Sequence, residues 1–184
     1  KDNNLLTMWL DSSHPKSFEY SNGKISKWLD LSGQNNYMTN SNSSYHPELK
    51  IVDKLSYKPA VHFDGVDDHF YSNSSSFIPS DPFAFFIVYY PYSHSENNLL
   101  SFQSQNFQLR GSKIGLHYNQ WIMNQVSEYS TQPNIINLQS FVHPTNTSYS
   151  AARIYVNGEQ TTNTFNTDLD GDGINDARNV MKYE

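Results

Sequence analysis

Residues 83–90 read Phe83-Ala84-Phe85-Phe86-Ile87-Val88-Tyr89-Tyr90, and Pro91 follows them. A short run that is rich in aromatic and β-branched residues and ends at a proline predicts a β-strand. Both faces of this strand are apolar. We therefore expect either a central strand that is covered on both faces, or a strand with one aromatic face turned toward a ligand.

The rest of the chain repeats this pattern on a smaller scale. Short apolar and aromatic runs alternate with Gly, Pro, Asn and Ser, and helical periodicity is almost absent. Asn157-Gly158 separates Ile154–Val156 from Glu159–Thr161 and predicts a two-residue hairpin, because both turn positions need a positive φ. Many short strands at such spacing favour an all-β, antiparallel sandwich.

Length and composition exclude several classes of function. A chain of 184 residues fits one domain with a substantial core. It has no cysteine, which excludes thiol catalysis, disulfides and Cys-based zinc sites but leaves the compartment open. The net charge of −6 and the absence of a basic cluster argue against a nucleic-acid partner. No apolar run approaches the roughly 20 residues of a membrane span, so we expect no membrane insertion.

The balance of side chains suits an extracellular β-protein. Neutral Asn and Ser residues are abundant and suit the surface, and the many aromatic residues suit the interior. We expect a secreted, cell-surface or virion-surface location. No signal peptide is visible, and because the chain begins abruptly at Lys1, we expect that any leader has been removed.

Five separate segments carry a resemblance to a known fold. The chain resembles concanavalin A-like, laminin G-like jelly-roll domains over residues 5–160, and this implies an antiparallel jelly-roll β-sandwich that fills residues 1–165. The fold hosts lectins, adhesion modules, pentraxins and glycan-cleaving enzymes, so it leaves the function open. In chain order the segments are Met8–Asp11, Gly23–Gly33, Lys58–Asp68, Phe85–Tyr89 and Ile154–Gly158.

Acidic residues alternate in a glycine-containing loop near the C-terminus, at residues 168–179. Carboxylates at the first, third and fifth positions, a backbone carbonyl at the seventh and an acid at the ninth are typical of a calcium loop. Asn in place of the usual closing Glu predicts a weak site, with a dissociation constant on the order of 10⁻⁴ to 10⁻³ M. A solvated acidic turn without metal is the alternative. The predicted ligands are Asp168, Asp170, Asp172, the Ile174 carbonyl, Asp176 and Asn179.

The same stretch resembles the calcium-binding repeats of the thrombospondin type-three class. The resemblance implies Ca²⁺ as a cofactor. It also implies that residues 166–184 form a calcium-loop segment, the possible start of a stalk repeat in a longer parent chain.

Other polar and aromatic residues have two readings each. Asp64, Asp67 and Asp68 flank Gly65 and could hold a second cation, or could form a structural turn capped by side-chain hydrogen bonds. We expect Asp11 and Asp30 to accept backbone hydrogen bonds at turns. Trp9 and Trp28 could line a sugar-binding face, but core packing is the expectation for both. Both choices for the acidic triplet remain open at this point.

Catalytic patterns are missing from the sequence. The Glu-x-Asp-x-x-Glu strand motif of the related jelly-roll glucanases is absent, and no Gly-x-Ser-x-Gly or His-x-x-x-His pattern occurs. We therefore predict that the protein is not an enzyme.

These observations predict a non-catalytic, extracellular, calcium-binding recognition or adhesion module that belongs to a larger surface protein. A glycan or another cell-surface ligand is the expected partner, because neutral sugars are usually held by aromatic rings together with hydrogen bonds from Asn, Asp and Gln. A structural spacer of a fibre is the alternative, and a polysaccharide-active enzyme is the third. The predicted ligand-binding residues are Tyr92, His94, Asn97, Tyr118, Asn119 and Trp121.

Overall fold

The computed structural model describes residues 6–74, 83–92, 98–102, 107–110, 115–118, 123–127, 133–143, 153–160 and 163–166. All strand pairs in these residues are antiparallel, and helical structure is confined to two single-turn 3₁₀ segments. The predicted all-β, antiparallel fold is confirmed. No helix within this part of the chain is long and apolar enough to cross a membrane. The chain divides into two compact units, Lys1–Pro79 and Ser80–Glu184, which we call unit 1 and unit 2.

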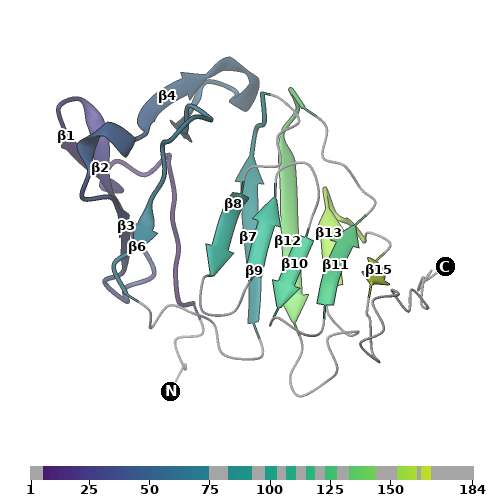
Figure 1. The fold of residues 1–184 in the computed structure, drawn as a ribbon. Helices are drawn as coiled ribbons and strands as arrows, with labels where there is room; N and C mark the ends of the chain where they lie inside the picture. The colour runs from purple at the N-terminus through teal and green to yellow at the C-terminus, as the bar shows by residue number, and fades with distance from the viewer. Residues whose placement is uncertain are drawn as a thin grey trace. The chain divides into compact units, whose positions relative to one another are not determined.

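Unit 1 contains a four-stranded sheet in the order β1-β2-β3-β6 and a two-stranded sheet of β4 and β5 (Figure 1). Its 3₁₀ segments are η1 (Ser43–Tyr45) and η2 (Asp53–Leu55). Its strands are β1 (Phe18–Ser21), β2 (Lys24–Leu29), β3 (Tyr37–Thr39), β4 (Glu48–Val52), β5 (Lys58–His62) and β6 (Tyr71–Ser72).

The β1–β2 hairpin fixes the start of β2. Its turn residues Asn22 and Gly23 have φ values of 53° and 81°. Positive φ at both positions is what a type I′ turn requires, and Asn and Gly tolerate it best. Ile25 is fully buried, and its backbone N–H donates to the Pro47 carbonyl at 2.9 Å. Lys24 is therefore held between a tight turn and the core of unit 1.

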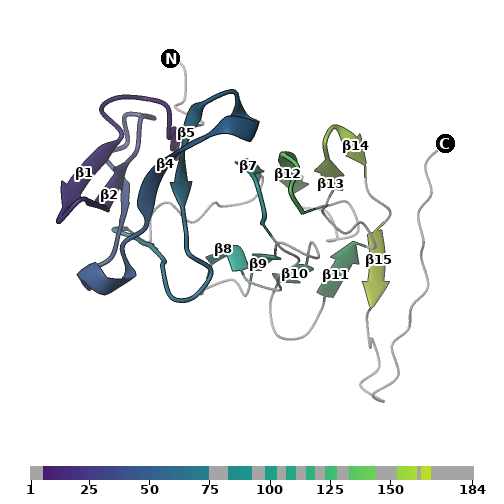
Figure 2. The ribbon, with the colours of Figure 1, turned by 90° about the horizontal axis from the view of Figure 1, so that it is seen from above.

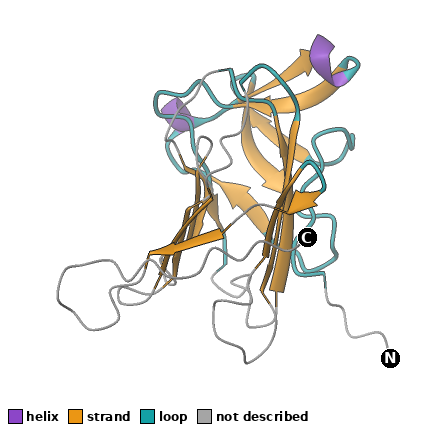
Figure 3. Ribbon diagram, turned by 90° about the vertical axis from the view of Figure 1, so that its right-hand side faces the viewer, coloured by secondary structure: helices purple, strands orange, loops and turns teal. Residues whose placement is uncertain are grey.

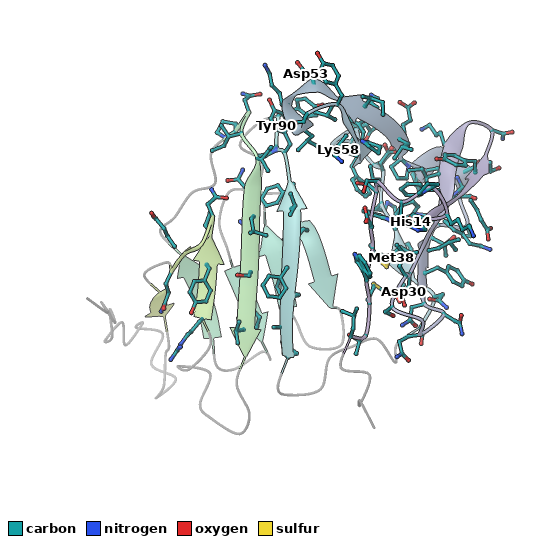
Figure 4. All side chains as sticks on the ribbon, turned by 180° about the vertical axis from the view of Figure 1, so that it is seen from behind. His14, Asp30, Met38, Asp53, Lys58 and Tyr90 are labelled. Carbon is teal, nitrogen blue, oxygen red and sulfur yellow. The ribbon has the colours of Figure 1, made fainter. Side chains whose placement is uncertain are left out.

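Two aspartates cap turns as the sequence predicts. Asp11 Oδ1 accepts hydrogen bonds from the backbone N–H of Ser13 at 2.8 Å and from its hydroxyl at 2.7 Å. Asp30, labelled in Figure 4, accepts from the backbone N–H groups of Trp9 (2.7 Å) and Ser32 (2.8 Å). The prediction that Trp9 packs in the core is wrong, because the residue is 51% exposed. The hydrogen bond to Asp30 fixes the backbone of Trp9 and leaves its indole uncovered.

Unit 2 contains sheets in the orders β14-β13-β12-β7, β10-β11-β15 and β8-β9. Figures 1 and 2 show β8, β9, β10 and β11 in a separate layer from β7, β12 and β13, and Figure 3 shows the strands nearly edge-on. The strands are β7 (Phe83–Tyr89), β8 (Asn98–Phe102), β9 (Phe107–Arg110), β10 (Gly115–Tyr118), β11 (Met123–Ser127), β12 (Asn137–His143), β13 (Arg153–Val156), β14 (Glu159–Gln160) and β15 (Asn163–Asn166).

Of the two arrangements that the apolar run of β7 predicted, the described strands do not show the doubly covered central strand. Among the described strands β7 pairs with β12 alone, at the end of its sheet. Its residues alternate between a half-buried face, which includes Phe85, and an exposed face, where Phe86 is 72% exposed. The continuous apolar run therefore reflects one covered face and one face open to solvent.

The core of unit 2 lies on the covered side of β12. Phe141 and Val156 are buried, and the Phe141 ring packs against the rings of Phe83 and Phe85 at centroid distances of 5.5 and 5.4 Å. Buried Gln139 donates to the Tyr89 hydroxyl at 2.7 Å.

The predicted hairpin at Asn157-Gly158 is confirmed. It joins β13 to β14, and both turn residues have a positive φ. Asn157 also ties the turn to β12, because its Oδ1 accepts from the backbone N–H of Leu138 at 2.8 Å. The division into a jelly-roll domain at residues 1–165 and a calcium segment at residues 166–184 stays a prediction.

Candidate metal site in an acidic loop

Three carboxylates gather in the loop that follows β5. Asp64, Asp67 and Asp68 each offer a ligand atom, and these atoms lie within 4.8 Å of one another. Gly65 permits the tight curl, since its φ is +78°. We call residues 64–68 the acidic loop. Carboxylate oxygens gathered at this distance can share one hard cation.

The acidic loop is closed by hydrogen bonds between its own ends. Asp64 Oδ1 accepts from the backbone N–H groups of Val66 (2.8 Å), Asp67 (3.2 Å) and Asp68 (3.3 Å). In return, Asp68 Oδ2 accepts from the backbone N–H of Asp64 at 3.1 Å. The capped turn that the sequence offered as an alternative is therefore present, and it holds the carboxylates close together.

This capping changes the acidity of Asp64. The N–H groups of Val66, Asp67 and Asp68 stabilise the ionised carboxylate, the first most strongly, and hold the pKa of Asp64 below its ordinary value. Partial desolvation opposes the shift, and the positive charge of Lys24 adds to it. The loop therefore favours the ionised carboxylate, which is the form that binds metal.

Asp68 is the least exposed carboxylate of the three. Its side chain is 3% exposed, although the residue as a whole is half-buried. Its Oδ1 is buried and has no hydrogen-bond partner. The nearest positive charge that pairs with it is the Lys24 ammonium group, with Nζ 3.8 Å from Oδ1.

A rigid aromatic group adjoins the acidic loop. His69 Nδ1 lies 2.6 Å from the Asp67 carbonyl, and Nε2 lies 3.0 Å from the Tyr71 hydroxyl. Because a carbonyl only accepts, Nδ1 carries the proton in neutral His69, and the Tyr71 hydroxyl donates to Nε2. The His69 ring contacts Tyr45 and Tyr71 at centroid distances of 5.0 and 4.9 Å. Tyr71, which is 64% exposed, is thus linked through His69 to the backbone of the acidic loop.

The predicted sites lie mostly elsewhere. The C-terminal calcium loop, residues 168–179, is outside the described residues, as are His94, Asn97, Asn119 and Trp121. Tyr118 is the last residue of β10. Tyr92 lies beyond the end of β7 and is exposed, and its ring packs edge-on against the ring of Tyr90, which is labelled in Figure 4, at a centroid distance of 5.4 Å. The convergence of these six ligand-binding residues stays a prediction.

Sequence reasoning found the three aspartates of the acidic loop but missed its neighbours. Lys24 comes from β2, His69 lies two residues before β6, and Tyr71 is the first residue of β6. His69 and Tyr71 follow Asp68 closely in the sequence, and only this proximity could have indicated that they adjoin the acidic loop. Nothing in the sequence indicated that Lys24 lies near it.

The lowered pKa of Asp64 predicts a specific acid sensitivity. A carboxylate whose folded-state pKa lies below 3.8 stabilises the folded chain above that pH, and this contribution is lost as the pH falls through the folded-state pKa. We expect Asp64→Asn to be less stable than the parent near neutral pH, and the difference to shrink below about pH 4. Urea unfolding of both proteins across this range measures it. A difference that stays constant with pH would contradict the capping role of the ionised group.

Comparison with protein families, curated proteins and solved structures finds no match.

Proposed function

We propose that the protein is a non-catalytic, extracellular recognition or adhesion module that binds calcium. The observation that carries this proposal is the trio of carboxylates in the acidic loop, with ligand atoms within 4.8 Å of one another. Calcium takes six to eight oxygen ligands, including carboxylates, backbone carbonyls and waters. The trio supplies the charged ligands, and water completes the shell at this exposed loop.

The predicted C-terminal loop supports calcium as the ion. Its Asp residues alternate as calcium ligands do, and its resemblance to thrombospondin type-three repeats implies the same metal. The protein would then carry two calcium sites on a jelly-roll scaffold within a longer surface protein.

A glycan is the ligand class that the surroundings of the acidic loop suit best. The exposed ring of Tyr71 can stack on the apolar face of a sugar ring, and it is held in place by His69. Sugar hydroxyls can complete the shell of a calcium ion at the carboxylates of the acidic loop. Preorganised aromatic and polar groups reduce the entropy cost of binding. The six residues from Tyr92 to Trp121 would form a separate contact surface.

The test is binding to a broad glycan array in calcium and again in chelator. We expect binding that chelator abolishes and that Tyr71→Ala weakens several-fold, up to about tenfold, since aromatic contacts contribute roughly 0.5–1.5 kcal/mol. Tyr57→Ala is the matched control, because Tyr57 is also exposed and lies in the turn before β5. Absence of any glycan binding in calcium would contradict the recognition role and favour the spacer.

A further inference from the structure

The negative charge of the buried Asp68 carboxylate is only partly compensated by its neighbours. Its side chain is 3% exposed and its Oδ1 is buried without a hydrogen bond, while Oδ2 accepts from Asp64. An ionised oxygen that is removed from water without a compensating contact costs free energy. Direct coordination by a cation would remove this cost.

Lys24 compensates the charge of Asp68 only in part. Its Nζ is 3.8 Å from Asp68 Oδ1, beyond the roughly 2.7–3.2 Å of an N–H···O hydrogen bond. The β1–β2 turn and buried Ile25 fix the backbone on either side of Lys24. Its side chain is 37% exposed, so the flexible stem can swing the ammonium group into water. The same charge contributes to the lowered pKa of Asp64.

We infer that Lys24 is an internal counterion of the acidic loop, which calcium must displace and which therefore sets the calcium affinity of the loop. This inference rests on the proposed function, because it concerns the same site. In the metal-free protein the ammonium group lies beside Asp68. When calcium binds, the two cations repel each other, and the lysine side chain moves outward at a cost in affinity.

The test is calorimetric titration of the 184-residue chain with calcium chloride. All proteins carry Asp168→Asn, Asp170→Asn and Asp172→Asn, so that the predicted C-terminal loop does not contribute heat. Lys24→Met keeps the length and the apolar stem of the side chain but removes its charge. We expect it to raise the calcium affinity about tenfold, as removal of one nearby charge in a partly exposed site should.

Two further variants isolate the charge of Lys24. Lys24→Arg restores a cation and should return the affinity to that of the parent. Lys54→Met makes the same change in net charge within an exposed pair, Lys54–Asp53, and should leave the affinity unchanged. Lys24→Gln replaces the methionine variant if circular dichroism shows that the latter is unfolded.

The outcomes separate this inference from the proposed function. Calcium binding by the parent with no change in Lys24→Met would overturn the counterion role and leave calcium binding intact. Binding by Lys24→Met but not by the parent would support the counterion role and overturn calcium binding by the native loop. Absence of binding in every variant would overturn both.

Discussion

Replacing Phe141 by alanine is expected to destabilise unit 2 by about 3–5 kcal/mol, the usual cost of removing a buried phenylalanine ring. The side chain is 3% exposed and packs between Phe83 and Phe85, so its removal leaves a cavity that these rings cannot fill without moving the β7 backbone. Urea unfolding followed by circular dichroism measures the loss. Val142→Ala, at the next position on the exposed face of β12, is the matched control and should cost less than about 1 kcal/mol. Similar losses in the two variants would contradict the assignment of the core to the Phe141 side.

Asp68→Asn is expected to lower the calcium affinity of the acidic loop by about two orders of magnitude, because a carboxylate in direct contact with a divalent ion is replaced by a neutral amide. Asparagine keeps an oxygen that can accept from the Asp64 backbone N–H, so the loop should remain closed. Calorimetry of the chain with a neutralised C-terminal loop measures the affinity.

Asp53→Asn serves as the control for Asp68→Asn, because Asp53 is exposed in η2 and the change in net charge is the same. It should bind calcium as the parent does. Equal affinity in Asp68→Asn and the parent would exclude the acidic loop as the calcium site.

Local rules were sufficient for much of the fold. The structure confirms the hairpin turn at Asn157-Gly158 and the capping of turns by Asp11 and Asp30. Each of these features depends on only a few neighbouring residues. The all-β, antiparallel character also followed, because it is encoded in the spacing of apolar runs and turn residues.

Features that depend on distant partners could not be predicted in this way. Whether β7 is central depends on which strands pair with it, and the exposure of Trp9 depends on what the rest of unit 1 leaves uncovered. At the site, the acidic triplet was visible because its members are close in sequence. Lys24 was not, because only tertiary structure brings β2 to the acidic loop.

The hydrogen bonds that close the acidic loop bear on the choice between calcium and magnesium. Magnesium requires a near-ideal octahedron of oxygens at about 2.0–2.1 Å, whereas calcium accepts irregular shells at about 2.3–2.6 Å. Asp64 and Asp68 each accept a hydrogen bond from the other's backbone, and we expect contraction around the smaller ion to strain these bonds. If the loop binds calcium as proposed, its backbone would therefore select the size of the ion, and an excess of magnesium should compete poorly for the site.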